Sequence, residues 1–241
     1  MRVTAAGVVL DAFALFRRDR AVLTPIAGLF WFLPAYAVAL LTPAPPEPPA
    51  GAEGAAAWEG LSRWLAAQAP WYALAWAVGL WGAATVYALY LRPERPELRG
   101  ALATAAGLWP RLLLASGLVA IMAAGGLLLW VVPGLYLLGR LMPVGPALAA
   151  ERPLSALGAI GRAWALTRGS GLSLGAVAAA TLGFGWIGSQ PLLLLDGWLR
   201  AQGGGNPVAV AIVDAGAAAI SMAAALASAL FAVAAYRRLA R

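Results

Sequence analysis

The side chains that could carry chemistry in this 241-residue chain are few in kind. The sequence contains seventeen arginines but no lysine, no histidine and no cysteine. It therefore cannot build a serine–histidine–aspartate triad, a thiolate nucleophile, a Schiff base or a histidine metal site. Catalysis would have to rest on ten carboxylates. The closest pair, Glu94 and Glu97, alternates with arginines in a proline-broken segment, which is typical of a solvated loop rather than an acid–base pair.

Two charged residues stand inside otherwise apolar runs, where burying a charge is expensive and a functional role is the first hypothesis. Arg140 lies seven residues after Pro133, and Asp214 lies seven residues after Pro207. At about 1.5 Å of rise per residue, both would lie about 10 Å from the outer ends of their helices. They could therefore meet as a buried ion pair. Alternatively, Asp214 lies unpaired at the interface, or it is a carboxylate that couples transport.

A third polar candidate within a run is Gln190. It precedes Pro191, which removes a backbone hydrogen bond, so we expect a kink at this point. The sequence shows no metal-ligand spacing, and glycine pairs such as Gly171 and Gly175 are typical of helix-packing faces rather than phosphate-binding loops. We therefore expect no catalytic residue, no cofactor and no metal.

These residues must be held by helices that cross a membrane. The apolar runs cover residues 21–41, 70–91, 112–132, 134–150, 171–195 and 207–236. A spanning helix needs about 20 apolar residues, and only the fourth run is shorter than that. With 62% hydrophobic and 11% charged residues, a soluble globule would have too few polar residues to cover its surface. The sequence predicts an all-α fold in which residues 1–241 form a single transmembrane domain. It would contain six transmembrane helices plus short interfacial amphipathic helices.

The arginines predict the orientation of the chain. If Met1 lies in the cytoplasm, Arg63 and Arg200 lie outside and Arg140 lies within a span. The remaining arginines face the cytoplasm: Arg2, Arg17, Arg18, Arg20, Arg92, Arg95, Arg99, Arg111, Arg152, Arg162, Arg168, Arg237, Arg238 and Arg241. This bias follows the positive-inside rule, so we expect a multi-pass membrane protein with both termini cytoplasmic. The loops near Pro46 and Gly204 would then face outward.

The positive charge also predicts a partner. The net charge is +7, but the arginines are distributed in small groups beside apolar helices. We therefore expect contacts with anionic lipid head groups at the cytoplasmic face rather than with nucleic acid.

Three amphipathic segments that end in arginine precede outward-going helices, at residues 9–18, 103–111 and 157–168. Apolar residues recur at helical spacing in the first and the last of them, namely Val9, Phe13 and Phe16, and Leu157, Ile160 and Trp164. Residues 12–18 and 163–169 also share a short sequence match. The chain can thus be read as three units of an interfacial helix plus a transmembrane hairpin, or as three unrelated helices of similar character.

Two further features lie between the expected spans. Prolines over residues 43–56 predict an extended outer loop, followed by a short interfacial helix with Trp58, Leu61 and Leu65 on one side. Between the third and fourth spans, only Pro133-Gly134 can break the helix, so we expect a tight turn there.

One stretch of the chain carries a motif whose members are Pro133, Gly134, Arg140, Glu151, Arg162, Trp164, Thr167, Arg168 and Gly169. In this respect the sequence resembles the membrane domain attached to some bacterial glycerophosphoryl diester phosphodiesterases, and the YciC-type stand-alone relatives of that domain. Shared features are a Pro-Gly turn, an arginine in the next helix, a glutamate at the cytoplasmic end of that helix and an ALxxSWxLTxG-like helix. Here Ala163 replaces the serine. The resemblance is good over residues 130–170 and loose over most of the chain. It implies six membrane helices and no catalytic activity, because the phosphodiesterase chemistry belongs to a separate soluble domain.

These observations favour a non-enzymatic integral inner-membrane protein that serves as a scaffold or accessory factor in lipid or envelope homeostasis, with an unidentified membrane-protein or enzyme partner. The alternative is a small permease or lipid transporter, which would need a hydrated route past Arg140, Gln190 and Asp214. A lipid-modifying enzyme is disfavoured because the usual nucleophiles and bases are missing.

Overall fold

The described part of the chain is mostly helical, and its main elements are long apolar helices. The computed structural model describes residues 3–43, 46, 54–94, 96–151, 153–201 and 206–240, and no strand occurs in these ranges. Six of its helical stretches are long and apolar enough to cross a membrane: Ala5–Leu41, Trp58–Leu91, Leu98–Leu129, Val131–Ala150, Gly171–Arg200 and Pro207–Leu239. The chain is therefore an all-α polytopic membrane protein, as the sequence predicts.

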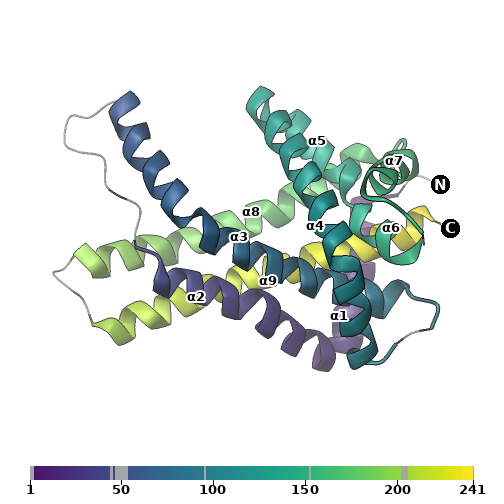
Figure 1. Ribbon diagram of the computed structural model, residues 1–241, viewed down its shortest axis with the longest axis horizontal. Helices are drawn as coiled ribbons and strands as arrows, with labels where there is room; N and C mark the ends of the chain where they lie inside the picture. Colours follow the sequence, from purple (N-terminus) through teal and green to yellow (C-terminus); the bar gives the residue numbers. More distant parts are fainter. Residues whose placement is uncertain are drawn as a thin grey trace.

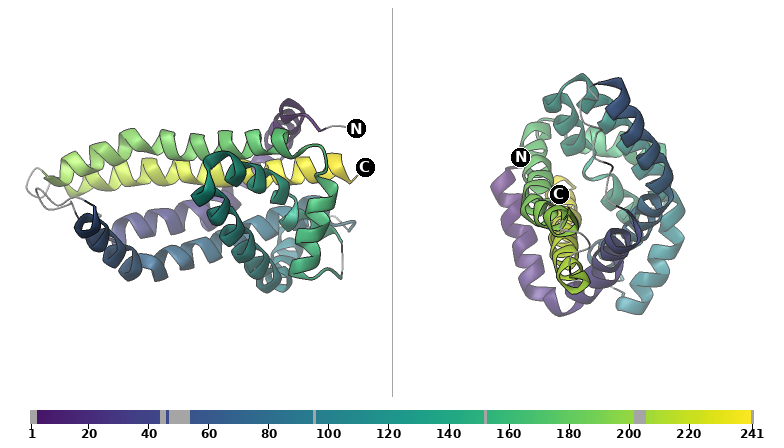
Figure 2. Two further views of the ribbon diagram at one scale, coloured as in Figure 1. Left: turned by 90° about the horizontal axis from the view of Figure 1, so that it is seen from above. Right: turned by 90° about the vertical axis from the view of Figure 1, so that its left-hand side faces the viewer.

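Long helices set the main axis of the molecule. Helices α8 (Gly171–Ala201) and α9 (Pro207–Leu239) run side by side along the longest dimension, with α2 (Leu33–Leu41) and the second half of α3 (Ala55–Leu91) beside them (Figures 1 and 2). The N- and C-termini lie at the same end, which we call the terminal end. Helices α2 and α8 end, and α9 begins, at the opposite end, which we call the distal end.

Helix α1 (Ala5–Ala27) contains the predicted boundary between an amphipathic segment and a span. Asp19 departs from helical geometry, with φ −115° and ψ 20°, so the helix changes direction there. The segment before Asp19 lies across the terminal end (Figure 2). Val9 and Phe13 are exposed, whereas Val8 and Ala12 pack into the bundle. The span after Asp19 continues through a π-helical turn, η1 (Gly28–Phe32), into α2.

Two segments expected as separate interfacial helices are instead continuous with the following span. Trp58, Leu61 and Leu65 belong to α3, which is 37 residues long, and residues 103–111 belong to α4 (Leu98–Leu129). The prolines at the two junctions, Pro70 and Pro110, lie inside these helices. A proline removes one backbone hydrogen bond and bends a helix, but it need not end it. Figure 1 shows the resulting change of direction along α3.

The turn predicted at Pro133-Gly134 occurs three residues earlier, at Trp130. The backbone of Trp130 is extended, with φ −171° and ψ 150°, and separates α4 from α5 (Val131–Leu141). Pro133 lies in the first turn of α5, where its missing N–H removes no helical hydrogen bond. The role of Gly134 is close packing, because a Cβ there would overlap the side chain and backbone of Leu127.

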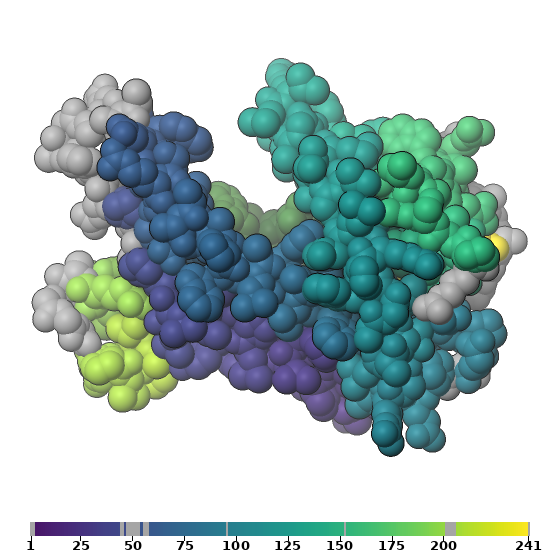
Figure 3. Space-filling model, viewed as in Figure 1, coloured from purple at the N-terminus to yellow at the C-terminus, as the bar shows by residue number. Residues whose placement is uncertain are grey.

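The α4–α5 hairpin projects sideways from the long bundle, and so does the first half of α3 (Figure 1). The tip of the hairpin is exposed and apolar, with Leu128, Trp130 and Val131 at its surface. In the space-filling view the molecule is hollowed between the two projections (Figure 3). After α5 the chain continues through α6 (Val144–Ala150) and α7 (Ala156–Leu166) at the terminal end before it enters α8.

Three consecutive residues fasten the C-terminal part of α9 to other elements. The Tyr236 hydroxyl donates to Glu151 (2.8 Å), Arg237 donates to the carbonyl of Tyr90 (2.6 Å), and Arg238 pairs with Asp11 (2.6 Å). We call these residues the α9 clasp.

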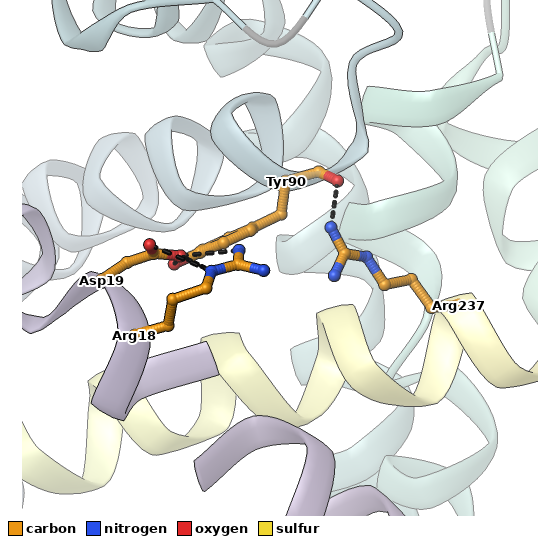
Figure 4. Close-up of polar contacts among 4 residues, drawn as sticks. All are labelled: Arg18, Asp19, Tyr90 and Arg237. Atoms are coloured by element: carbon orange, nitrogen blue, oxygen red, sulfur yellow. Dashed lines mark hydrogen bonds and ion pairs between the residues drawn. The ribbon is translucent and has the colours of Figure 1, made fainter. Parts of the chain in front are cut away.

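The Tyr90 hydroxyl extends this network to the bend in α1 (Figure 4). It donates to Asp19 at 2.8 Å, and Arg18 donates to the same carboxylate. Polar contacts at the terminal end thus join α9 to α1 and α3 and to the segment between α6 and α7.

Some of the sequence predictions concern residues beyond this description. Arg2, Arg95, Arg152, Arg241 and Gly204 lie outside the described residues, as does most of the proline-rich stretch over 43–56.

Candidate functional site

Arg140 is buried between α5 and α7, and its hydrogen bonds there are made to a hydroxyl and a carbonyl rather than to a carboxylate. Its relative exposure is 7%. Nη1 donates to the Tyr136 hydroxyl (2.9 Å), and Nη2 donates to the Trp164 carbonyl (2.6 Å). The guanidinium also lies 4.0 Å from the centre of the Trp164 ring, which is a cation–π contact. The Trp164 carbonyl belongs to the last turn of α7, where carbonyls lack helical partners and favour a cation.

The motif residues around Arg140 form one contact cluster. The Thr167 hydroxyl donates to the carbonyl of Ala163 (2.7 Å) and lies 3.2 Å from the carbonyl of Arg140. Gly169, with φ 78°, then turns the chain from α7 into α8. Arg168 is exposed beside this turn. The cluster therefore fixes how α7 is joined to α5.

A second contact involves the other two polar motif members. Arg162 donates through Nε to both oxygens of Glu151 at 2.9 Å, and Glu151 also accepts the Tyr236 hydroxyl. The structure thus places the polar motif residues Arg140, Thr167, Glu151 and Arg162 in two structural contacts, whereas Pro133 and Gly134 lie in the first turn of α5.

Asp214 lies far from Arg140, at the distal end of α9, and has a different partner. Arg200 donates to Asp214 (3.1 Å) and to Asp196 (2.7 Å), which joins α8 to α9. Among the described residues, Arg140 takes part in no ion pair. The two intramembrane charges are therefore not brought together. The assumption of equal depth fails because α5 begins in the hairpin that projects sideways, whereas α9 begins at the distal end of the long bundle.

Gln190 belongs to neither charged group. It is half-buried in α8, and its amide donates to the carbonyl of Trp186 one turn earlier (3.3 Å). Helix α8 is continuous through Pro191.

The Asp196–Arg200–Asp214 group, which we call the distal triad, opens onto a cavity of about 590 Å³ between α2, α3, α8 and α9. The remaining wall is largely apolar. Trp31, Trp64, Tyr72 and Trp76 provide aromatic surface, and α9 contributes small residues. Specific ligand sites commonly combine such an apolar body with a few polar groups at one place.

A second cavity of about 430 Å³ adjoins the first and reaches the hollow of Figure 3. The two share lining residues Trp31, Ala75, Trp76 and Ala225. The second cavity is also lined by residues of α8, by Val119 of α4, by Leu138 and Leu141 of α5, and by Met142 just after α5. We call the joined cavities the bundle groove: it begins at the distal triad and ends between the two projecting elements.

Small residues of α9 form the floor of the bundle groove. Ala218, Ser221, Ala225, Ser228 and Ala232 recur at spacings of three and four, so they lie on one face of the helix. Asp214 begins the same stripe. This periodicity is visible in the sequence and is the signal that could have indicated the groove. Arg200 was predicted only as an outer-side arginine, and Asp196, which follows the fifth apolar run, was not predicted as a site residue.

The arrangement can hold an elongated amphiphile, with a polar head at the distal triad and an apolar tail along the groove. Within the described ranges, no group of three or more histidine, cysteine, aspartate or glutamate side chains lies close enough together to hold a metal ion. Comparison with protein-family models, curated proteins and solved structures found no match to this chain.

Proposed function

We propose that this protein is a non-enzymatic integral membrane protein of the bacterial inner membrane that holds a lipid in its bundle groove. In this role it serves as an accessory factor or scaffold in lipid or envelope homeostasis. Membership of the glycerophosphoryl diester phosphodiesterase membrane-domain family, with its YciC-type relatives, is part of the proposal.

The observation that carries the proposal is the form of the bundle groove. Its two parts measure about 590 and 430 Å³, within the range of about 300–1,000 Å³ that ligand pockets occupy. Polar charge is concentrated at one end, at Asp214 and its partners, and apolar side chains line the rest. That polarity matches a lipid, whose head group is charged and whose chains are not.

The same proposal assigns the terminal end to the cytoplasm. Arginines of α1, α7 and α9 lie on elements at that end, and they would meet anionic head groups there. Arg17 and Arg20 are exposed on α1, next to the apolar face that carries Phe13.

The test is to obstruct the groove and measure retained lipid. Ser221 lies in the groove floor, so Ser221→Trp should fill the space that the chains would occupy. Ile212→Trp is the matched control, because Ile212 is 66% exposed on the same helix and lies outside both cavities. Each protein is purified in detergent, and the lipid that remains bound is extracted and quantified against protein.

We expect the wild-type protein and Ile212→Trp to retain lipid and Ser221→Trp to lose most of it while its thermal unfolding stays cooperative. Equal lipid retention in all three proteins would contradict the proposal, and so would a wild-type protein that retains none.

A lipid transporter is the second candidate, because the groove connects the distal end to a lateral hollow. Transport would require the groove also to open at the terminal end, where the α9 clasp holds the elements together. Translocation of a labelled lipid across proteoliposomes, faster than in protein-free vesicles and lost in Ser221→Trp, would establish this alternative.

A further inference from the structure

The distal triad carries an uncompensated negative charge. Arg200 is shared between two carboxylates, at 2.7 Å from Asp196 and 3.1 Å from Asp214, so the group sums to one negative charge. The Asp214 side chain is only 6% exposed. Its Oδ2 accepts from Arg200, whereas its Oδ1 has no hydrogen-bond donor among the described residues. A buried carboxylate with an unused oxygen favours a donor or a cation from outside the protein.

Aromatic rings lie on the wall of the same cavity. Trp64 and Tyr72 approach each other edge to face, with 6.3 Å between ring centres, and Trp76 lies one turn beyond Tyr72. The Trp64 indole is oriented by its N–H, which donates to the carbonyl of Pro43 (3.0 Å). The faces of such rings attract cations, and ammonium groups in particular.

The positive member of the triad is the most accessible. The Arg200 side chain is 38% exposed, compared with 16% for Asp196 and 6% for Asp214. A guanidinium in this position can still donate to a phosphate while it pairs with the carboxylates, because it carries five N–H donors. The triad thus presents a cation beside two anions, which is the complement of a phosphate beside an ammonium.

We infer that the distal triad selects zwitterionic lipids, with Asp214 and Asp196 facing the ammonium group and Arg200 facing the phosphate. The inference rests on the proposed function, because it names the class of lipid that the bundle groove holds. An anionic lipid with an uncharged alcohol head group offers the phosphate but no cation, so it leaves the negative charge of the triad unmatched.

The inference can be tested by competition between two head groups. The protein is equilibrated in vesicles that contain equal amounts of phosphatidylethanolamine and phosphatidylglycerol with identical acyl chains. It is then extracted in detergent, and the head groups of the retained lipid are quantified. We expect the wild-type protein to enrich the ethanolamine lipid about fivefold, the ratio that corresponds to about 1 kcal/mol.

The decisive variant changes the sign of the triad. Asp196→Asn combined with Asp214→Asn leaves Arg200 alone, so the local charge becomes positive. The preference should then reverse in favour of phosphatidylglycerol. Asp196→Asn alone keeps the buried Asp214–Arg200 pair and should remove most of the enrichment, which provides a test even where the double variant unfolds.

Glu59→Gln is the control. Glu59 pairs with Arg63 in the first half of α3, and its carboxylate is 64% exposed and lies outside both cavities. It should keep the wild-type head-group ratio. Bound lipid with the composition of the vesicle, or enrichment that survives the loss of both aspartates, would overturn the inference while leaving the proposed function intact. Failure to retain any lipid would instead overturn the proposed function.

Discussion

The buried guanidinium of Arg140 contacts carbonyl, hydroxyl and aromatic groups instead of a carboxylate. Its Nη2 donates to the Trp164 carbonyl at 2.6 Å, and its charge lies over the Trp164 ring. The Nε atom is buried without a hydrogen-bond partner among the described residues, so the site is not completely satisfied. These contacts assign Arg140 to the joint between α5 and α7 rather than to the bundle groove.

The first prediction concerns the independence of the two intramembrane charges. Arg140→Leu leaves the Trp164 carbonyl without its donor and should destabilise the protein by about 1–3 kcal/mol. Asp214→Leu changes the other end of the molecule, where Arg200 retains its ion pair with Asp196. Sites without shared partners behave additively, so the double variant should lose the sum of the two effects. Thermal unfolding in detergent measures all three.

Arg168→Leu is the control for this experiment, because Arg168 is exposed next to the same motif. It should change stability very little. A double variant that is more stable than Arg140→Leu alone would show that Arg140 and Asp214 are coupled, in contradiction to the contacts described above.

Among the helices, α5 and α8 approach most closely through glycine. A Cβ on Gly139 would overlap the backbone of Gly175, and one on Gly171 would lie 2.7 Å from Arg140 Cδ. Small residues permit such close contact between membrane helices, where packing rather than the hydrophobic effect drives association. The predicted packing role of Gly171 and Gly175 is therefore confirmed: Gly175 packs against Gly139, and Gly171 packs against Tyr136 and Arg140.

The second prediction follows from this crossing. Gly139→Ala should destabilise the protein by about 1–3 kcal/mol, because the added methyl group forces two backbones apart. Gly183→Ala is the matched control within α8, since no atom lies within 4 Å of its Cβ position. Alanine is the better helix former, so that substitution should be neutral or stabilising by up to about 1 kcal/mol. Equal effects of the two substitutions on thermal unfolding would exclude the close contact.

Hydrophobic length predicted which segments are helical, but it could not predict how they bend. Pro70 and Pro110 are strong local signals for a helix end, yet both lie inside continuous helices. Asp19, which carries no comparable signal, marks a true break. The break at Asp19 coincides with a tertiary contact, because Tyr90 from α3 donates a hydrogen bond to Asp19. A partner 71 residues away cannot be recognised from the local sequence.

For the whole molecule, the positions of the termini and loops give a test of topology. Both termini lie at one end, and the arginine distribution predicts that this end faces the cytoplasm. Because the chain has no cysteine, Pro46→Cys and Glu97→Cys each introduce a single label site. An impermeant thiol reagent should modify position 46 but not position 97 in intact cells. Permeabilised cells, in which both should react, control for accessibility, and labelling at 97 in intact cells would reverse the orientation.

The candidate site was only partly predictable at this scale. Asp214 can be recognised in the sequence as a charge within an apolar run. Its partner, Arg200 rather than Arg140, could not be predicted without knowing that the α4–α5 hairpin projects away from the long axis. The groove itself depends on the separation of α3 from α5, to which residues far apart in sequence contribute. Local periodicity could indicate the small-residue face of α9, but not the empty space opposite it.

The position of α9 determines when this protein can first hold a ligand during its synthesis. Helix α9 packs against α1, α2, α3 and α8, and its small residues are the floor of the groove. It leaves the ribosome after all of them. Until α9 inserts, lipid chains cover the faces of α1 and α2 that will later contact it. This exposure to lipid is not costly, because the lipid chains are as apolar as those helix faces. Before α9 inserts, the helices that precede it therefore form an open set in the membrane, and a lipid can be captured in the groove only after α9 has been translated.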